Sequence, residues 1–269
     1  HGLAAAAPAG HAVLLCPTIS PQDVEDFAGR LAAHGLQAID APMSGGPARA
    51  LDGSMSLMVA CADAVFTGQR ELLEALSSKL FRVGERCGDG ARTKLVNNLL
   101  AGINLVAGAE ALALGAKLGL DKRALFEVIK ASGGASWIVG DRMARALDGD
   151  YTPRARSVIL TKDVGLAVQM ADEAGIATPL GDEALRLFKA TVAAGLGELD
   201  DAALDVARNI AKKDTRVIRR AKAAINGIDP VDVKNSYLLE QRYTYELNLA
   251  GVADEHRDAF VETGKPKGN

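Results

Sequence analysis

The sequence predicts a small α/β part followed by a larger all-α part, so that the chain is mostly helical overall. Before residue 88, short apolar runs of strand length alternate with helical segments. After Gly90 the pattern contains only helices and the turns between them. We therefore divide the chain into residues 1–88, 89–200 and 201–269, the last of which differs in character from the rest.

The first part opens with the apolar run His11–Cys16, which has the length and composition of a buried strand. Ser20 and Pro21 have the residue types of an N-cap and a first helical residue, and this helix should end near His34. A strand–helix–strand unit with short links favours parallel pairing of its two strands. The remaining elements are expected to be strands at 36–41, 54–61 and 81–84, a helix at 62–79 and a loop at 40–47.

The second part begins with the most apolar segment of the chain, which contains no proline. Residues 91–118 could form one helix, roughly 40 Å long at about 1.5 Å per residue. Its apolar surface implies burial and self-association, so we expect a homo-oligomer. Helix breaks are expected near Gly119, Gly133, Gly134, Gly149, Gly175, Gly195, Gly197, Gly227 and Gly251.

Composition and charge argue against several classes of protein. Hydrophobic residues make up 48% and charged residues 24%, which is typical of a globular protein, and the net charge of −3 does not suit a nucleic-acid partner. The three cysteines are widely spaced and fit free thiols in the cytoplasm, and the four histidines show no metal-ligand spacing. No uninterrupted apolar run reaches the length of a membrane span. The chain begins with His1 rather than Met, so we expect a fragment or a processed chain.

A lysine and two asparagines lie near the start of the apolar helix, at Lys94, Asn97 and Asn98. Positions four residues apart share a helix face, so Lys94 and Asn98 should point the same way. An unpaired polar group taken out of water costs about 1–3 kcal/mol, and a charge costs more. The pair is therefore a candidate active site, although a lysine that reaches back to water is the commoner outcome for such a position.

Two other polar features are candidates for function. Ser44, Gly45 and Gly46 follow a predicted strand, and a hydroxyl with close-approaching backbone N–H groups suits a carboxylate; an ordinary turn is the alternative. Lys162 and Asp163 interrupt an amphipathic helix, where solvated surface charges are the simpler interpretation. Trp137, the only tryptophan, more often belongs to a core than to a ligand site.

Together these motifs resemble the β-hydroxyacid dehydrogenases, especially 3-hydroxyisobutyrate dehydrogenase and tartronate semialdehyde reductase. The resemblance covers about residues 10–200 and is carried by five motifs in register. They are Thr18-Ile19-Ser20-Pro21, Asp40-Ala41-Pro42-Met43-Ser44-Gly45-Gly46, Gly90 with Lys94-Leu95-Val96-Asn97-Asn98, Ser136-Trp137 and Lys162-Asp163.

The resemblance implies an oxidation of a short 3-hydroxy acid that depends on NAD or NADP. Lys94 would be the general acid/base on the substrate hydroxyl, and Asn98 would orient that hydroxyl or the lysine. By the same resemblance, Ser44, Gly45 and Gly46 would hold the substrate carboxylate, whereas Thr18 and Lys162 would lie beside the nicotinamide. Burial and neighbouring positive charge would bring the lysine pKa toward the working pH.

The chain departs from this family in its first part. No glycine-rich pyrophosphate turn is present in the sequence, and residues 1–88 correspond to the remnant of a Rossmann-type sheet without its amino-terminal half. We therefore expect weak dinucleotide binding, and a chain that is inactive or nearly so when assayed alone.

The chain departs again after about residue 202. Residues 202–269 resemble the carboxy-terminal helices of the enoyl-CoA hydratases (crotonases), and no long linker separates the two resemblances. By that resemblance, Phe260 and either Lys265 or Lys267 would face coenzyme A. A basic, solvated helix at 212–222 and an ordinary terminal helix are the simpler interpretation. A natural fusion, a chimera and a mixed assignment all fit this arrangement.

Two alternatives to the dehydrogenase remain open from the sequence. The chain could be an acyl-CoA-binding protein related to enoyl-CoA hydratase, or a non-catalytic helical oligomerisation module.

Overall fold

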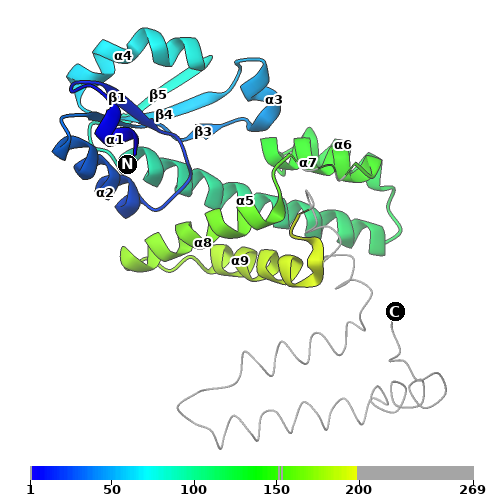
Figure 1. The fold of residues 1–269 in the computed structure, drawn as a ribbon. Helices are drawn as coiled ribbons and strands as arrows, with labels where there is room; N and C mark the ends of the chain where they lie inside the picture. The colour runs from blue at the N-terminus through cyan, green and yellow to red at the C-terminus, as the bar shows by residue number, and fades with distance from the viewer. Residues whose placement is uncertain (1, 151, 153, 199–269) are drawn as a thin grey trace, which may run out of the picture.

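The structure is a computed structural model that describes residues 2–150, 152 and 154–198. The candidate coenzyme A contacts Phe260, Lys265 and Lys267, and the predicted breaks at Gly227 and Gly251, lie outside the described residues. The predicted fold class is confirmed, because a small α/β part precedes a larger helical part (Figure 1).

A five-stranded mixed sheet forms the first part. β1 and β2 pair in parallel, as the strand–helix–strand pattern predicted, and β4 and β5 are also parallel. β4 runs antiparallel to β3 and touches β2 at the single pair Asp40 and Ala60. The strands are β1 (Ala12–Leu15), β2 (Gln37–Asp40), β3 (Met43–Ser44), β4 (Ser56–Ala60) and β5 (Lys79–Gly84).

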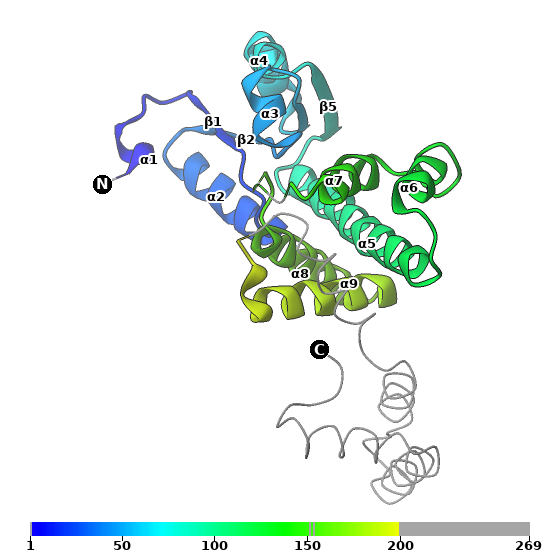
Figure 2. The same ribbon diagram turned by 90° about the vertical axis from the view of Figure 1, so that its right-hand side faces the viewer.

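Helices cover this sheet on two sides. α4 lies on one side, and α2 and the first turns of α5 lie on the other (Figures 1 and 2). The Ser20 hydroxyl caps α2 by accepting a hydrogen bond from the Asp23 N–H at 3.0 Å, with Pro21 at the first helical position, as predicted. The helices of this part are α1 (Leu3–Ala6), α2 (Pro21–Ala33), α3 (Gly46–Leu51) and α4 (Asp63–Leu76).

One prediction in this part is wrong. The expected loop over residues 40–47 contains the short strand β3 and the start of α3. β3 forms because Met43 and Ser44 pair with Leu57 and Ser56 of β4, which are distant in the sequence. The local Pro- and Gly-rich composition of the segment predicted only a turn, and long-range pairing with a buried strand overrides that preference.

The helical part is built around α5 (Asp89–Lys117), which confirms the single long helix predicted there. Among the helices that the structure describes, α5 is the one that is long and apolar enough to cross a membrane. α7, α8 and α9 pack against it (Figure 2). Predicted breaks at Gly119, Gly149 and Gly175 coincide with helix ends. The other helices are α6 (Lys122–Lys130), α7 (Trp137–Asp148), α8 (Ser157–Glu173), α9 (Pro179–Thr191) and the short π-helix η1 (Val192–Leu196).

Each part has its own apolar core. Ile39, Leu57 and Val59 of the sheet pack with Leu73 of α4. In the helical part, Leu105 of α5 packs in a second cluster that includes Val164 of α8 and Phe188 of α9. The start of α5 lies against the sheet, so this helix carries its polar residues to the junction between the two cores.

Candidate active site

α5 brings Lys94 and Asn98 to the same buried wall. Each residue is only 8% exposed, and they lie one helical turn apart on the face that packs toward α8. The shared face predicted from their i, i+4 spacing is therefore present. Lys94 does not reach back to bulk water, so the simpler interpretation of the sequence does not hold for this lysine.

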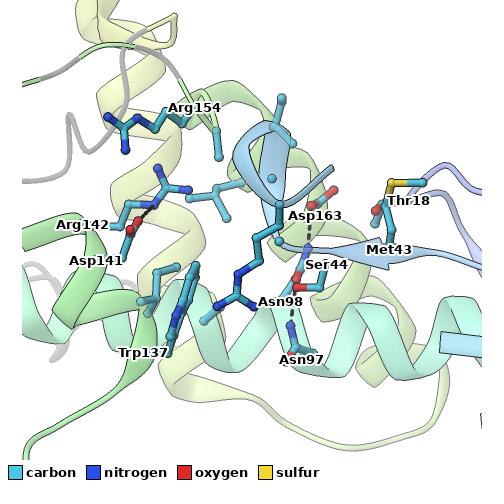
Figure 3. Close-up of a pocket in the computed structure, with 18 of the residues that line it drawn as sticks. Thr18, Met43, Ser44, Asn97, Asn98, Trp137, Asp141, Arg142, Arg154 and Asp163 are labelled. Atoms are coloured by element: carbon cyan, nitrogen blue, oxygen red, sulfur yellow. Dashed lines mark hydrogen bonds and ion pairs between the residues drawn. The ribbon is translucent and has the colours of Figure 1, made fainter. Parts of the chain in front are cut away.

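A chain of polar contacts links α5 to α8 (Figure 3). Asn97 Nδ2 donates to Asn98 Oδ1 at 3.1 Å, and Asn98 Nδ2 donates to Asp163 Oδ2 at 2.7 Å. Because an ionised carboxylate only accepts, Asp163 fixes which end of the Asn98 amide faces α8. Asn98 is thus held in one orientation at the cavity wall.

The same carboxylate organises the lysine of α8. Asp163 is 4% exposed, and its Oδ1 lies 2.6 Å from Lys162 Nζ. Lys162 Nζ also donates to the carbonyl oxygen of Thr18, in the turn after β1. Lys162 therefore ties the helical part to the sheet part. The sequence had favoured two solvated charges here, which is wrong for Asp163 because packing against α5 buries it.

The surroundings of Lys94 lower its pKa. Burial lowers the pKa of the Lys94 amine below its ordinary value, and the nearby Lys162 cation lowers that pKa further. The Asp163 carboxylate opposes both and raises the Lys94 pKa. Burial dominates, so Lys94 gives up its proton more readily than a lysine in water. This is the property that a general base needs near neutral pH.

The Ser44 loop faces these groups from the sheet part. Ser44 ends β3, and Gly45 and Gly46 follow with positive φ values of 136° and 68°. A Cβ added at Gly45 would lie 2.7 Å from the Arg49 Cβ, so a larger residue would displace α3. The two glycines therefore allow a tight backbone turn at the cavity, where N–H groups can approach a ligand closely.

One cavity of about 740 Å³ joins these elements. Six of the seven site residues predicted from the sequence line it, namely Thr18, Ser44, Gly45, Gly46, Lys94 and Asn98. Lys162 does not line the cavity and reaches it through Asp163, which does. The volume lies within the range of about 300–1,000 Å³ that is usual for small-molecule and cofactor sites.

Several residues of this cavity were not foreseen as site residues. Trp137, the first residue of α7, is 59% exposed and lines the cavity rather than a core. The Arg49 guanidinium lies over the Trp137 ring, 5.0 Å from its centroid. Arg142 and Arg154 also line the cavity, and no local pattern of the sequence set them apart from other arginines.

The cavity fits the reacting end of a dinucleotide better than a metal. Thr18 lies beyond the carboxyl end of β1, and ligands of open α/β sheets bind at that edge of parallel strands. The Lys162 ammonium is positioned beside Thr18 by its bond to the Thr18 carbonyl. Within residues 2–150, 152 and 154–198, no three His, Cys, Asp or Glu side chains come together as a possible metal site.

Comparison with known proteins identifies the family. An L-threonate dehydrogenase of Cupriavidus necator is 38% identical over 204 residues, covering 76% of this chain and 69% of that protein. The chain belongs to the β-hydroxyacid dehydrogenase family. Two family models agree: residues 1–84 match the NAD-binding domain of 6-phosphogluconate dehydrogenase, and residues 88–206 match the NAD-binding model of NADP-dependent 3-hydroxyisobutyrate dehydrogenase.

Other β-hydroxyacid dehydrogenases extend the likeness. The crystal structure of 3-hydroxyisobutyrate dehydrogenase from Salmonella typhimurium is 37% identical, with a TM-score of 0.71 over 76% of this chain and 71% of that one. 2-(Hydroxymethyl)glutarate dehydrogenase of Eubacterium barkeri is 33% identical over 76% of this chain and 67% of that protein. The chain spans 64% of an L-threonate dehydrogenase of Pectobacterium atrosepticum, at 39% identity over 72% of this chain.

A second likeness has a different character. A 70-residue stretch, 26% of this chain, is 77% identical to part of a hydrolase of Rhodococcus jostii. That protein is named a 7a-methyl-1,5-dioxo-hexahydro-1H-indene-carboxyl-CoA hydrolase. The match covers 27% of that hydrolase. The likeness covers about a quarter of each protein, and the crotonase-like tail stays a prediction.

Proposed function

We propose that this site oxidises the hydroxyl group of a short 3-hydroxy acid with NAD or NADP. The observation that carries the proposal is the buried Lys94 and Asn98 pair, which faces the Ser44 loop across one cavity. The relatives' names mention L-threonate, 3-hydroxyisobutyrate and 2-(hydroxymethyl)glutarate. Each of these acids carries a hydroxyl on the carbon β to a carboxylate. That shared arrangement defines the proposed substrate class.

The Ser44 loop would hold the carboxylate of the acid. The Ser44 hydroxyl and the backbone N–H groups of Gly45 and Gly46 are donors at the cavity wall, and a carboxylate accepts several such bonds at once. The carboxylate would anchor the acid with its hydroxyl directed toward α5.

Lys94 would then move the proton. In its neutral form the amine accepts the hydroxyl proton while the bond from the carbinol carbon to hydrogen breaks, and the carbon–oxygen double bond forms. Bound NAD or NADP supplies the hydride acceptor for this oxidation. Asn98, held by Asp163, would orient the hydroxyl, and in the reverse direction the Lys94 ammonium returns the proton.

Thr18 and Lys162 would position the nicotinamide end of the cofactor. Thr18 follows the end of β1, and Lys162 lies on α8. The hydrogen bond from Lys162 to the Thr18 carbonyl joins the two positions. In this assignment residues 1–88 serve dinucleotide binding, residues 89–200 serve substrate binding and self-association, and residues 201–269 form a crotonase-like tail.

The test pairs activity with binding. Trp137 is the only tryptophan and lines the cavity, so its fluorescence should change when 3-hydroxyisobutyrate or L-threonate is titrated into the full chain. In a fusion of this chain to the amino-terminal Rossmann half of a β-hydroxyacid dehydrogenase, formation of NADH or NADPH, followed by absorbance, should fall by about 10²–10⁴ in Lys94→Ala, the usual contribution of a general acid/base. Lys117→Ala is the matched control, because Lys117 lies exposed on the same helix. Failure of both acids to bind, or undiminished turnover in Lys94→Ala, would contradict the proposal.

Self-association is a further part of the proposal. Val96 and Leu114 on α5, and Leu118 directly after it, are between 58% and 67% exposed, and such apolar side chains are commonly covered in an oligomer. Sedimentation equilibrium should therefore give a mass above that of one chain.

The three cysteines are free thiols, which supports a cytoplasmic location.

Acyl-CoA binding is the second candidate function, and the 70-residue likeness to a carboxyl-CoA hydrolase favours it. Phe260, Lys265 and Lys267 would contact coenzyme A in this case. Calorimetric titration with coenzyme A should then show binding that is lost in Phe260→Ala. No heat of binding would remove this candidate and leave the dehydrogenase site unaffected.

A further inference from the structure

Arg49 of α3 lines the cavity and contacts two of its walls. Its half-buried side chain runs along the Ser44 loop, where a Cβ built at Gly45 would lie 2.7 Å from Arg49 Cβ and 2.8 Å from Arg49 Cδ. The guanidinium begins one bond beyond Cδ, and its carbon lies over the Trp137 ring, 5.0 Å from the centroid. Ser44 and Trp137 are both on the cavity wall in Figure 3. The guanidinium therefore lies beside the loop that is proposed to hold the acid.

The contact with Trp137 positions the Arg49 charge without neutralising it. An aromatic face attracts a cation through the quadrupole of the ring and supplies no negative charge of its own. The N–H donors of a guanidinium form a rigid fork that matches the two oxygens of a carboxylate. A guanidinium that is held in this way is well suited to binding an acid.

Within the part of the chain that the structure describes, the Arg49 guanidinium forms no ion pair and donates no hydrogen bond. The two aspartates that line the cavity contact other cations. Asp163 Oδ1 lies 2.6 Å from Lys162 Nζ. Asp141 Oδ2 lies 3.5 Å from Arg142 Nε. A bound acid would therefore meet Arg49 without displacing a carboxylate of the protein.

Asp52, three residues after Arg49, forms hydrogen bonds within its own turn. Asp52 Oδ1 accepts from the Ser54 N–H at 2.9 Å. The hydrogen bonds from Ser54 lower the Asp52 pKa most, and the Arg49 charge lowers it less. Asp52 thus interacts with Arg49 only at longer range.

We infer that the Arg49 guanidinium binds the carboxylate of the hydroxy acid, beside the donors of the Ser44 loop. The inference rests on the proposed hydroxy-acid function and adds a cation to its carboxylate site. Because the two oxygens of a carboxylate carry several lone pairs, they accept bonds from the loop and from Arg49 together. Trp137 is then a positioning residue, since its ring holds the guanidinium at this wall.

Two variants separate the charge of Arg49 from its packing. Arg49→Met keeps an unbranched apolar chain against the Trp137 ring but has neither charge nor N–H donors. Arg49→Lys keeps a positive charge but lacks the paired fork. The full chain is titrated calorimetrically with 3-hydroxyisobutyrate. The dissociation constant should be weaker by about 10-fold or more in Arg49→Met and by about threefold in Arg49→Lys, because charge-assisted bonds to a carboxylate are strong and a paired fork strengthens them.

A neutral ligand tests whether the lost contact is one with the carboxylate. 3-Hydroxyisobutyramide has nearly the size of 3-hydroxyisobutyrate without its charge. Its dissociation constant should weaken by about threefold or less in Arg49→Met, because a neutral amide has no charge to pair with the guanidinium. Retained binding of the amide also shows that the variant is folded.

Arg30→Met is the matched control. Arg30 on α2 also lies over an aromatic ring, 5.7 Å from the Phe27 centroid, but it does not line the cavity. The dissociation constant of 3-hydroxyisobutyrate should be unchanged in this variant.

The outcomes separate the inference from the proposed function. If Arg49→Met bound the acid as tightly as the parent or as Arg49→Lys, or weakened the acid and the amide equally, Arg49 would serve packing alone. The inference would then be overturned and the hydroxy-acid site would remain. Failure of the parent chain to bind 3-hydroxyisobutyrate would overturn the proposed function and the inference with it.

Discussion

At the scale of single residues, burial and the Asp163 carboxylate have opposite effects on the pKa of Lys94. Burial and the Lys162 cation lower the Lys94 pKa, and the Asp163 carboxylate raises it. Asp163 also accepts the Asn98 amide hydrogen at 2.7 Å. One carboxylate therefore sets both the charge of the proposed base and the orientation of its partner, which makes Asp163 a positioning residue.

Asp163→Asn separates these two effects. An asparagine oxygen can still accept from Asn98, but the negative charge that raises the Lys94 pKa is gone. The Lys94 pKa should move further down. Because the neutral amine is the proposed base, the rise of kcat/KM with pH for hydroxy-acid oxidation should move to lower pH. A ¹³C NMR titration of the lysine side chains measures the same shift without turnover, and a Lys94 pKa that stayed put or rose would contradict this role for Asp163.

At the scale of elements, the close approach of α5 to α8 and α9 depends on a residue without a side chain. A Cβ built at Gly102 would lie 2.7 Å from Val164 Cγ2 and 3.3 Å from a ring carbon of Phe188. Val164 and Phe188 are fully buried in the helical core, so neither can move aside freely. The same packing buries Asp163, the residue before Val164 in α8.

Gly102→Ala should lower the free energy of unfolding by about 1–3 kcal/mol, the usual cost of overfilling a packed core. Gly140→Ala is the matched control within α7, since nothing lies within 4 Å of the position of its Cβ. That substitution should stabilise the protein by up to about 1 kcal/mol, because alanine favours the helix over glycine. Urea unfolding followed by circular dichroism measures both, and equal effects of the two variants would refute the packing argument.

At the scale of the whole molecule, Asp40 joins the two cores. It ends β2, is 1% exposed, and its Oδ2 accepts from the N–H groups of Gly88 at 2.8 Å and Ala91 at 3.0 Å. Those groups belong to the N-cap residue and the first turn of α5, where unpaired N–H groups attract negative charge. A Cβ at Gly90 would meet this carboxylate at 2.8 Å, so Gly90 is needed for the contact. Asp40 thereby places the helix that carries Lys94 against the sheet that carries Ser44.

Asp40→Ala should lower the free energy of unfolding by about 2–6 kcal/mol, because two buried N–H groups lose their acceptor at about 1–3 kcal/mol each. Burial raises the pKa of Asp40 in spite of its backbone donors, so the charge is costly and Asp40→Asn should be milder. Thermal unfolding of the three proteins gives the order. If Asp40→Ala were as stable as the parent, the link between the two cores would not depend on this residue.

Local signals were sufficient for much of the fold. The Ser20–Pro21 cap, the parallel pairing of β1 with β2, and the glycine breaks after α5, α7 and α8 all followed from short stretches of sequence. These features depend on backbone preferences within a few residues, and such preferences act before any long-range contact forms. The spacing of Lys94 and Asn98 placed both on one face for the same reason.

The tertiary structure alone decided what these residues meet. The short strand β3 exists because β4 pairs with it, and Asp163 is buried because α8 packs on α5. Ser44 and Lys94, fifty positions apart, share a cavity whose far wall carries Arg142 and Arg154. By itself the sequence determined most of the helices and strands, and it placed Lys94 and Asn98 on one face of their helix. The contacts of Lys94 and Asn98 and the lowered Lys94 pKa arise from packing between distant segments, which no local pattern encodes.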